Sequence, residues 1–352
     1  MAGGIGSRFW PVSRSSHPKQ FIDILGTGKT LIQQTYERFT RTVPKENIFI
    51  VTNDIYTGLV KEQLPELNEA QILAEPIMRN TAPCIAYGCY KISQINPNAC
   101  VVIAPSDHLI LDTEGFVHAI NLSLQTAASN DCLITLGIKP SRPDTGYGYI
   151  QFNSVILDKD FHKVKSFTEK PNIDLAKTFI QSGEFLWNAG IFVWSVKNII
   201  KAFKQHLPEI NDVFKEGENV YNTAGEQEFI QKAYYQCTNI SIDYGIMEKA
   251  DNVYVLPSEF GWSDLGTWAS VYDLIDKDYV GNAVLPSEKV IMYDSSNCMV
   301  NVPKGKVVIL QGLHDFIVVE NNNTLLICPR SEEQNVKQVV ADVKQRFGQE
   351  FI

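Results

Sequence analysis

The 352-residue sequence lacks any apolar run that approaches the roughly 18 consecutive residues of a membrane-spanning helix. Its first eight residues also lack the charged and then apolar layout that is typical of a signal peptide. These two absences argue against a membrane partner and against secretion. We therefore expect a soluble, cytoplasmic protein, and its length is enough for one large domain and a smaller one.

Paired cysteines and an excess of basic residues are absent as well. None of the seven cysteines belongs to a C-x-x-C pair, and no histidine stands at zinc-site spacing from a cysteine. Reduced thiols in the core explain this odd, scattered set better than a disulfide framework does. The formal net charge of -9 argues against nucleic acid as a partner, because nucleic-acid binding needs a basic surface.

Apolar runs alternate with helical patterns over the first two thirds of the chain. Strands are predicted at residues 48–52, 71–74, 100–104 and 132–137. Apolar residues at helical spacing lie between them, and Asn80 or Thr81 is placed to cap a helix. This alternation predicts a doubly wound, Rossmann-like α/β domain with a mostly parallel sheet.

The pattern changes twice after residue 140. Strands at 147–152, 163–168 and 191–194 and helices at 196–206 and 226–235 suggest an elaborated substrate region on the same sheet. Five short β-like runs then follow at 290–294, 298–302, 307–311, 316–320 and 324–328, before a closing helix at 332–347. Their even spacing predicts a small β-solenoid-like module or a barrel fragment. The expected domains are 1–275 and 276–352.

A glycine-rich stretch opens the chain, with the sequence Ala2-Gly3-Gly4-Ile5-Gly6-Ser7-Arg8, and Lys19 follows it. Glycines let successive backbone N–H groups approach a phosphate closely, and Arg and Lys add charge. The spacing matches neither a P-loop nor the dinucleotide motif of dehydrogenases. Such loops normally follow a buried strand. We expect that a first strand is missing here, through truncation or a downstream start codon, rather than that the loop is misinterpreted.

Seven blocks of sequence, in order from residue 2 to 268, resemble the sugar-phosphate nucleotidyltransferases, and the best match is to mannose-1-phosphate guanylyltransferase. The first block is the glycine stretch with Pro18-Lys19-Gln20-Phe21. The others are Glu75-Pro76-x-x-Arg79-Asn80-Thr81-Ala82-Pro83, Ala104-Pro105-Ser106-Asp107-His108, Thr145-Gly146-Tyr147-Gly148-Tyr149-Ile150, Phe167-Thr168-Glu169-Lys170-Pro171, Trp187-Asn188-Ala189-Gly190-Ile191-Phe192 and Trp262-Ser263-Asp264-Leu265-Gly266-Thr267-Trp268. The absent first strand is the clear departure from the family.

The resemblance implies a role for each block. Asp107 and Asp264 would hold Mg²⁺, which takes one or two carboxylates together with substrate phosphates. The alternatives are a cap or turn residue for Asp107 and a helix N-cap for Asp264. Arg8 and Lys19 would hold the triphosphate, and Lys170 would place the sugar phosphate. The nucleotide would contact Ala2, Gly3, Gly4, Gly6, Ser7, Arg8, Glu75, Asn80, Thr81 and Ser106.

The sugar phosphate would contact Gly146, Gly148, Glu169, Lys170 and Asn188. An amide such as that of Asn188 both donates and accepts hydrogen bonds, which suits a sugar diol. A hairpin turn is the alternative for the two glycines, and a solvated ion pair is the alternative for Glu169 and Lys170.

The predicted reaction transfers GMP from GTP to mannose 1-phosphate and gives GDP-mannose and pyrophosphate by in-line displacement. The alternatives are a nucleotidyltransferase for another sugar 1-phosphate or nucleotide, and a non-catalytic GDP-mannose-binding protein. The resemblance also implies that the β module mediates a homodimer. The chain has no room for the isomerase domain of the bifunctional members.

Overall fold

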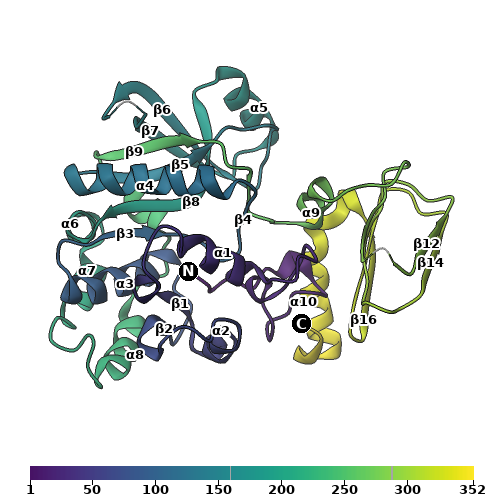
Figure 1. Ribbon diagram of the computed structural model, residues 1–352, viewed down its shortest axis with the longest axis horizontal. Helices are drawn as coiled ribbons and strands as arrows, with labels where there is room; N and C mark the ends of the chain where they lie inside the picture. The colour runs from purple at the N-terminus through teal and green to yellow at the C-terminus, as the bar shows by residue number, and fades with distance from the viewer. Residues whose placement is uncertain (159, 287) are drawn as a thin grey trace. The chain divides into compact units, whose positions relative to one another are not determined.

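The computed structural model describes residues 1–158, 160–286 and 288–352 (Figure 1). The chain forms two compact units. The larger unit contains residues 1–3, 36–106 and 110–262, and the smaller unit contains residues 4–35, 107–109 and 263–352. Each unit is built from segments that lie far apart in the sequence.

A six-stranded sheet forms the centre of the larger unit, in the order β3-β8-β5-β9-β7-β6. The strands are β3 (Cys100–Ile103), β5 (Leu133–Ile138), β6 (Gly148–Ile156), β7 (His162–Glu169), β8 (Phe185–Ser195) and β9 (Val253–Ser258). Only β5 and β9 are parallel neighbours among these strands, because β8 lies antiparallel between β3 and β5 and β7 lies antiparallel between β9 and β6. The α/β class is confirmed, and the sheet is mixed although four of its six strands run in one direction.

Helices cover both faces of this sheet. On β8, Phe192 and Trp194 pack into the core under α3 (Thr81–Ile95), α6 (Val196–His206), α7 (Pro208–Lys215) and α8 (Glu226–Gln236). The alternate residues Ile191 and Val193 pack into the core with α4 (Thr113–Ser129). This period of two explains why β8 is continuously apolar at residues 189–194, since a strand covered on both faces has no solvent side.

The first residues of the chain lie beside a second, parallel pair of strands, β1 (Ile50–Asn53) and β2 (Ile72–Glu75). The Ala2 N–H donates to Val51 O at 2.7 Å, and the Thr52 hydroxyl donates to Ala2 O at 2.8 Å. On the other side, the Met1 amino group donates to Ala104 O at 2.8 Å. The glycine stretch therefore leaves from a strand-like position, as a phosphate-binding loop does.

The larger unit also contains α2 (Thr57–Gln63), α5 (Ile173–Ser182) and the π-helix η6 (Asp243–Met247). Helix α1 (Leu31–Phe39) and the two-residue strands β4 (Leu109–Ile110) and β10 (Trp262–Ser263) lie where the chain passes from one unit to the other. None of the helices in the described ranges is long and apolar enough to span a bilayer.

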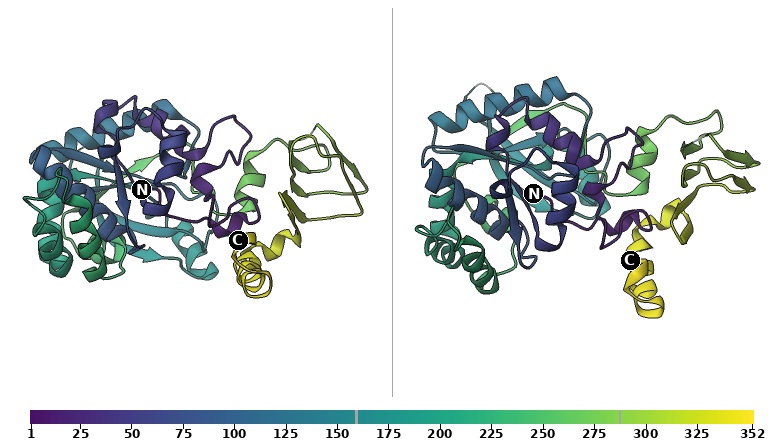
Figure 2. Two further views of the ribbon diagram at one scale, coloured as in Figure 1. Left: turned by 90° about the horizontal axis from the view of Figure 1, so that it is seen from below. Right: turned by 60° about the horizontal axis from the view of Figure 1, so that its bottom comes forward.

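The smaller unit contains a β-solenoid (Figure 2). One sheet has the order β11 (Ala283–Leu285), β13 (Met299–Asn301), β15 (Phe316–Asn321) and β16 (Thr324–Pro329), and β12 (Val290–Tyr293) pairs with β14 (Val308–Gln311). Met299 pairs in parallel with Ile317, and Val290 pairs in parallel with Val308. In each pair the two residues lie one turn of the coil apart. These parallel turns support the solenoid over the barrel fragment. The chain continues through η7 (Arg330–Asn335) into α10 (Val336–Phe347), and α9 (Trp268–Leu274) precedes the coil.

Candidate active site

The glycine loop of the smaller unit passes over Lys19. Gly6 has φ +69°, and a Cβ at this position would lie 2.5 Å from the Lys19 Cβ, so only glycine fits without a shift. The short 3₁₀ turn η1 (Ser7–Phe9) begins directly after Gly6. Within the described residues, the buried Nε of Arg8 has no hydrogen-bond partner. A buried donor without an acceptor is costly, so this guanidinium is suited to an anionic ligand.

Lys19 connects the two predicted metal blocks. Its ammonium lies 2.8 Å from Asp107 Oδ2 and donates to Asp264 O at 2.7 Å and to Leu265 O at 3.2 Å. Only 5% of the Lys19 side chain is exposed, and these three acceptors match its three N–H donors. Leu265 has φ +45°, a left-handed conformation that is rare for a branched residue. The structure thus brings Lys19, Asp107 and the backbone of the Asp264 turn together.

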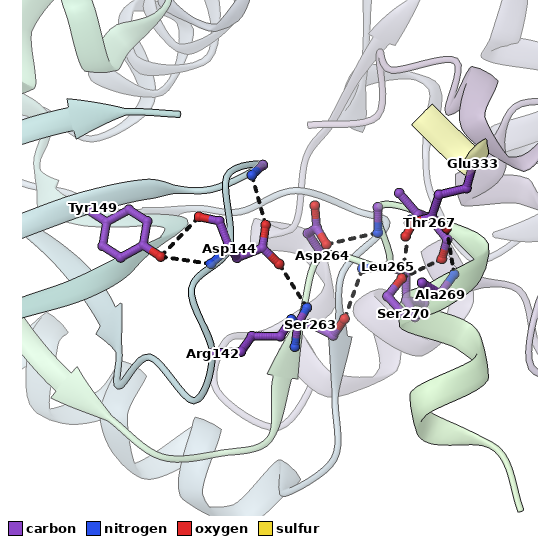
Figure 3. A network of polar contacts seen from close by, with 12 residues as sticks. Arg142, Asp144, Tyr149, Ser263, Asp264, Leu265, Thr267, Ala269, Ser270 and Glu333 are labelled. Atoms are coloured by element: carbon purple, nitrogen blue, oxygen red, sulfur yellow. Dashed lines mark hydrogen bonds and ion pairs between the residues drawn. The ribbon is translucent and has the colours of Figure 1, made fainter. Parts of the chain in front are cut away.

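The Asp107 carboxylate is held ionised by its neighbours. Burial by itself would raise its pKa, but the Lys19 charge, His108 and hydrogen bonds together hold this pKa below its ordinary value. The Asp264 Oδ1 accepts from the Gly266 N–H at 2.9 Å, and the Ser263 hydroxyl accepts from the Leu265 N–H at 3.1 Å (Figure 3). The described residues contain no cluster of three or more metal-ligating side chains. Two carboxylates are the kind of protein ligand set that Mg²⁺ uses when phosphates complete its coordination.

In the larger unit, the predicted sugar residues meet at the ends of β6 and β7. Gly148 pairs with Glu169, and a Cβ on Gly148 would lie 2.1 Å from Glu169 Oε1, so the glycine makes room for the carboxylate. Lys170 has φ +48°, and its N–H donates to Tyr147 O at 3.2 Å. Gly146 lies in the preceding turn, where its N–H donates to Asp144 Oδ1 at 2.8 Å. Gly146 thus lies in a turn held by Asp144, whereas Gly148 is the first residue of β6. The hairpin turn weighed for these glycines is not formed, because the flanking strands β5 and β6 pair with other strands.

Asp243 is a functional candidate that the sequence analysis missed. Its Oδ1 accepts from Asn188 Nδ2 at 2.8 Å, and Asn188 Oδ1 in turn accepts from Thr135 Oγ1 at 3.3 Å. Burial raises the pKa of Asp243 and that of Glu169, and the charge of Asp243 raises the latter further, whereas Lys170 lowers both. Asp243 begins the π-helix η6, an element frequent at functional sites. In the sequence it stands at no predicted strand end and outside the seven family blocks.

Among the predicted nucleotide residues of the larger unit, Glu75 is the buried carboxyl. The whole residue is 5% exposed, its carboxylate accepts from the Tyr234 hydroxyl at 2.8 Å, and burial raises its pKa to about 7. A Cβ on Gly3 would lie 3.6 Å from Glu75 Oε2, so this side chain lies beside the glycine stretch. No motif in the sequence indicates the Tyr234 contact, because Tyr234 comes from α8.

The capping role weighed for Asn80 and Thr81 is present. Asn80 Oδ1 accepts from the Thr81 N–H at 2.9 Å at the start of α3, and Asn80 has φ +67°. The Thr81 hydroxyl accepts from the Ile242 N–H at 2.8 Å, next to Asp243. Ser106 is buried, and its N–H donates to Met1 O at 2.9 Å. These residues shape the larger unit, and their contact with a nucleotide stays a prediction.

A second polar network precedes the sugar residues (Figure 3). Arg142 pairs with Asp144 at 3.0 Å and lies over the rings of Tyr147 and Trp187. The Tyr149 hydroxyl accepts from the Asp144 N–H at 3.1 Å and donates to Asp144 O at 3.0 Å. These contacts fix the turn whose Tyr147 carbonyl holds Lys170. Arg142 was not singled out from the sequence.

Comparison with known proteins identifies the class of this site. The model of the nucleotidyl transferase family matches residues 1–279, and that of the MannoseP isomerase/GMP-like β-helix domain matches residues 288–343. The chain therefore belongs to the nucleotidyl transferase family and is an enzyme of that class.

Several similar proteins carry names that describe a more specific activity within this class. A mannose-1-phosphate guanylyltransferase of Escherichia coli is 33% identical over 97% of this chain and 74% of its own length. An alginate biosynthesis protein AlgA of Pseudomonas aeruginosa is 36% identical over 97% of this chain and 71% of its own. A crystal structure described as mannose-1-phosphate geranyltransferase from Thermus thermophilus is 28% identical, covers 98% of both chains and has a TM-score of 0.88. The resemblance found in the sequence is thereby confirmed.

Proposed function

We propose that the enzyme transfers GMP from GTP to α-D-mannose 1-phosphate, with release of pyrophosphate and formation of GDP-mannose. Similarity over at least 97% of this chain to relatives named mannose-1-phosphate guanylyltransferase carries this proposal. The chemistry of the site supports it, since Arg8 in the glycine loop has a buried donor without an acceptor among the described residues and Asp107 is held ionised. Such a reaction, with phosphorylated metabolites as substrates, suits the cytoplasm, and we keep the homodimer as part of the same proposal.

In the proposed reaction, an oxygen of the mannose 1-phosphate attacks the α-phosphorus of GTP in line with the departing pyrophosphate, and no covalent enzyme intermediate forms. The glycine loop and Arg8 hold the triphosphate and stabilise the charge on pyrophosphate. Lys170 holds the attacking phosphate, and Glu169 and Asn188 bind sugar hydroxyls. The rate would come from positioning and charge neutralisation.

Mg²⁺ is the metal that we propose for the two blocks that contain Asp107 and Asp264. The donor set fits, because carboxylate oxygens are the ligands that Mg²⁺ prefers and the pKa of Asp107 is lowered. When bound, the ion would neutralise charge on the reacting phosphates. Asp107 and Asp264 would hold it. Lys19 adds a fixed positive charge beside Asp107, and this limits the net negative charge of the two acidic blocks.

The test is release of pyrophosphate from GTP and mannose 1-phosphate in the presence of Mg²⁺. ATP and UTP replace GTP in parallel reactions, and glucose 1-phosphate replaces mannose 1-phosphate. We expect release with GTP and mannose 1-phosphate at a kcat/KM at least ~100-fold above that of the other pairs, the scale on which hydrogen-bonded recognition discriminates. Faster release with another pair would replace the proposed substrates.

A further inference from the structure

The glycine loop of the smaller unit has little regular structure of its own. Between Gly4 and Pro18, all of which the structure describes, the only helical turn is η1 and the only β contact is the isolated bridge between Arg14 and His17. Fixing the backbone of each residue costs on the order of 1–2 kcal/mol, so such a segment stays ordered only when other parts of the chain hold it. Phe9 packs in a buried cluster that includes Ile24, Leu31 and Leu109, and many of the other contacts that hold the loop come from the C-terminal part of the chain.

Arg14 provides the largest set of these contacts. It is 8% exposed, and its guanidinium donates to Pro11 O at 3.2 Å and Glu350 O at 3.2 Å. It also donates to the β15–β16 hairpin, at Asn321 O (3.2 Å), Asn323 Oδ1 (3.3 Å) and Thr324 Oγ1 (3.0 Å). All five of these acceptors are neutral. The planar guanidinium therefore joins three separate segments by directed hydrogen bonds to neutral groups rather than by an ion pair.

Other residues strengthen the same connection. Asn321 Nδ2 donates to Pro11 O at 3.1 Å, and Trp10 Nε1 donates to Phe351 O at 2.7 Å. The Trp10 ring packs with Leu326 of β16 and Val336 of α10 in one buried cluster. The loop is thus attached to the last hairpin of the solenoid and to the helix that closes the chain.

The same C-terminal segment contacts the helix that follows the Asp264 turn. The Glu333 carboxylate of η7 accepts from the Ala269 N–H at 2.9 Å and from the Thr267 side chain, at the start of α9 (Figure 3). Burial raises the pKa of Glu333 above its ordinary value, and the charges of Arg330 and Arg8 offset only part of that rise. Residues 321–351 therefore support both the glycine loop and the helix that follows the Asp264 turn.

We infer that the C-terminal β module helps to form the triphosphate site. Arg14 is the positioning residue through which this module orders the glycine loop. Arg14 itself touches no substrate, because its donors are used within the protein. Without the hydrogen bonds of Arg14, the loop would sample other conformations, and Arg8 would no longer be held for a phosphate. This inference rests on the proposed function only for the identity of the nucleotide.

Arg14→Met is the test, with Val300→Ala as the matched control. Val300 is fully buried in the solenoid strand β13, in a core cluster to which no described residue of the glycine loop belongs, so its truncation destabilises the same module without removing a contact of the loop. Hydrogen exchange of residues 4–18 and the KM values for GTP and mannose 1-phosphate are measured for both variants and for the native chain, together with thermal unfolding.

We expect Arg14→Met to speed exchange of residues 4–18 at least ~10-fold and to raise the KM for GTP at least ~10-fold, with a smaller change in the KM for mannose 1-phosphate. Val300→Ala should lower the melting temperature but leave both the exchange of the loop and the KM for GTP near the native values. Native exchange and an unchanged KM for GTP in Arg14→Met would overturn the inference, as would equal effects of the two variants. If the native chain releases no pyrophosphate, the proposed function fails, and the exchange rates alone decide this inference.

Discussion

Removal of the Lys19 charge is the perturbation whose effect can be worked out most directly. The ammonium lies 2.8 Å from Asp107 Oδ2, and two unit charges at that distance attract by about 6 kcal/mol at an effective dielectric constant of about 20. The cost of taking both charges out of water offsets much of this attraction. Removing one partner of a buried pair typically costs about 3–5 kcal/mol. Because 26% of the Asp107 side chain is exposed, water recovers part of the loss. We expect Lys19→Met to lower the free energy of unfolding by about 3 kcal/mol.

A double-mutant cycle separates the pair from its surroundings. Asp107→Asn should cost about 2 kcal/mol, and the double variant Lys19→Met/Asp107→Asn should be more stable than the sum of the single effects by about 2 kcal/mol. Urea unfolding of the four proteins gives these values. Lys201→Met is the control, since the pair of Lys201 with Asp131 is more than half exposed and should contribute no more than about 1 kcal/mol. A coupling energy below about 0.5 kcal/mol would refute the reasoning.

Three further predictions concern single residues. Asp107→Ala should lower kcat at least ~10²-fold in the pyrophosphate assay while circular dichroism stays native, and native turnover would remove Asp107 from the metal site. Gly148→Ala should raise the KM for mannose 1-phosphate at least ~10-fold, because its Cβ would displace Glu169; an unchanged KM would contradict this. The pKa of Glu75 is raised from 4.5 to about 7, so stability present below pH 4.5 should be lost as pH rises to 7. Glu75→Gln should reduce the change of the urea midpoint with pH over that window, and a pH dependence equal to that of the native protein would contradict the prediction.

The order and type of elements could be predicted from the sequence, because each has a strong local pattern. The helix expected at 196–206 is α6, and the strand expected at 100–104 is β3. The pairing of strands could not be predicted in the same way. β8 inserts antiparallel between β3 and β5, although it follows both in the chain. Local periodicity shows that a strand is covered on both faces, but it carries no information about which neighbours it pairs with.

In the candidate site, too, some features could be predicted from the sequence and others could not. Asp107 and Glu169 were predicted because they stand at strand ends within family motifs, whereas Asp243 begins a π-helix that has no periodic signature. The contact of Lys19 with Asp107 joins two motifs that are distant in sequence, so neither motif predicts it. The assignment of Lys19 to the triphosphate stays a prediction, and the observed contacts use its three donors on the protein.

Backbone conformation gives independent support for two of the predicted blocks. Eight described residues other than glycine have positive φ, and six of them are Asn or Asp, which tolerate that region. The other two are Lys170 and Leu265. A left-handed conformation at such residues costs on the order of 1–3 kcal/mol and persists only where the surroundings determine it. Here the Tyr147 carbonyl holds the Lys170 N–H, and the Lys19 ammonium holds the Leu265 carbonyl. Both departures from local preference thus fall within blocks that were identified by resemblance to the family, as expected where function rather than stability selects the conformation.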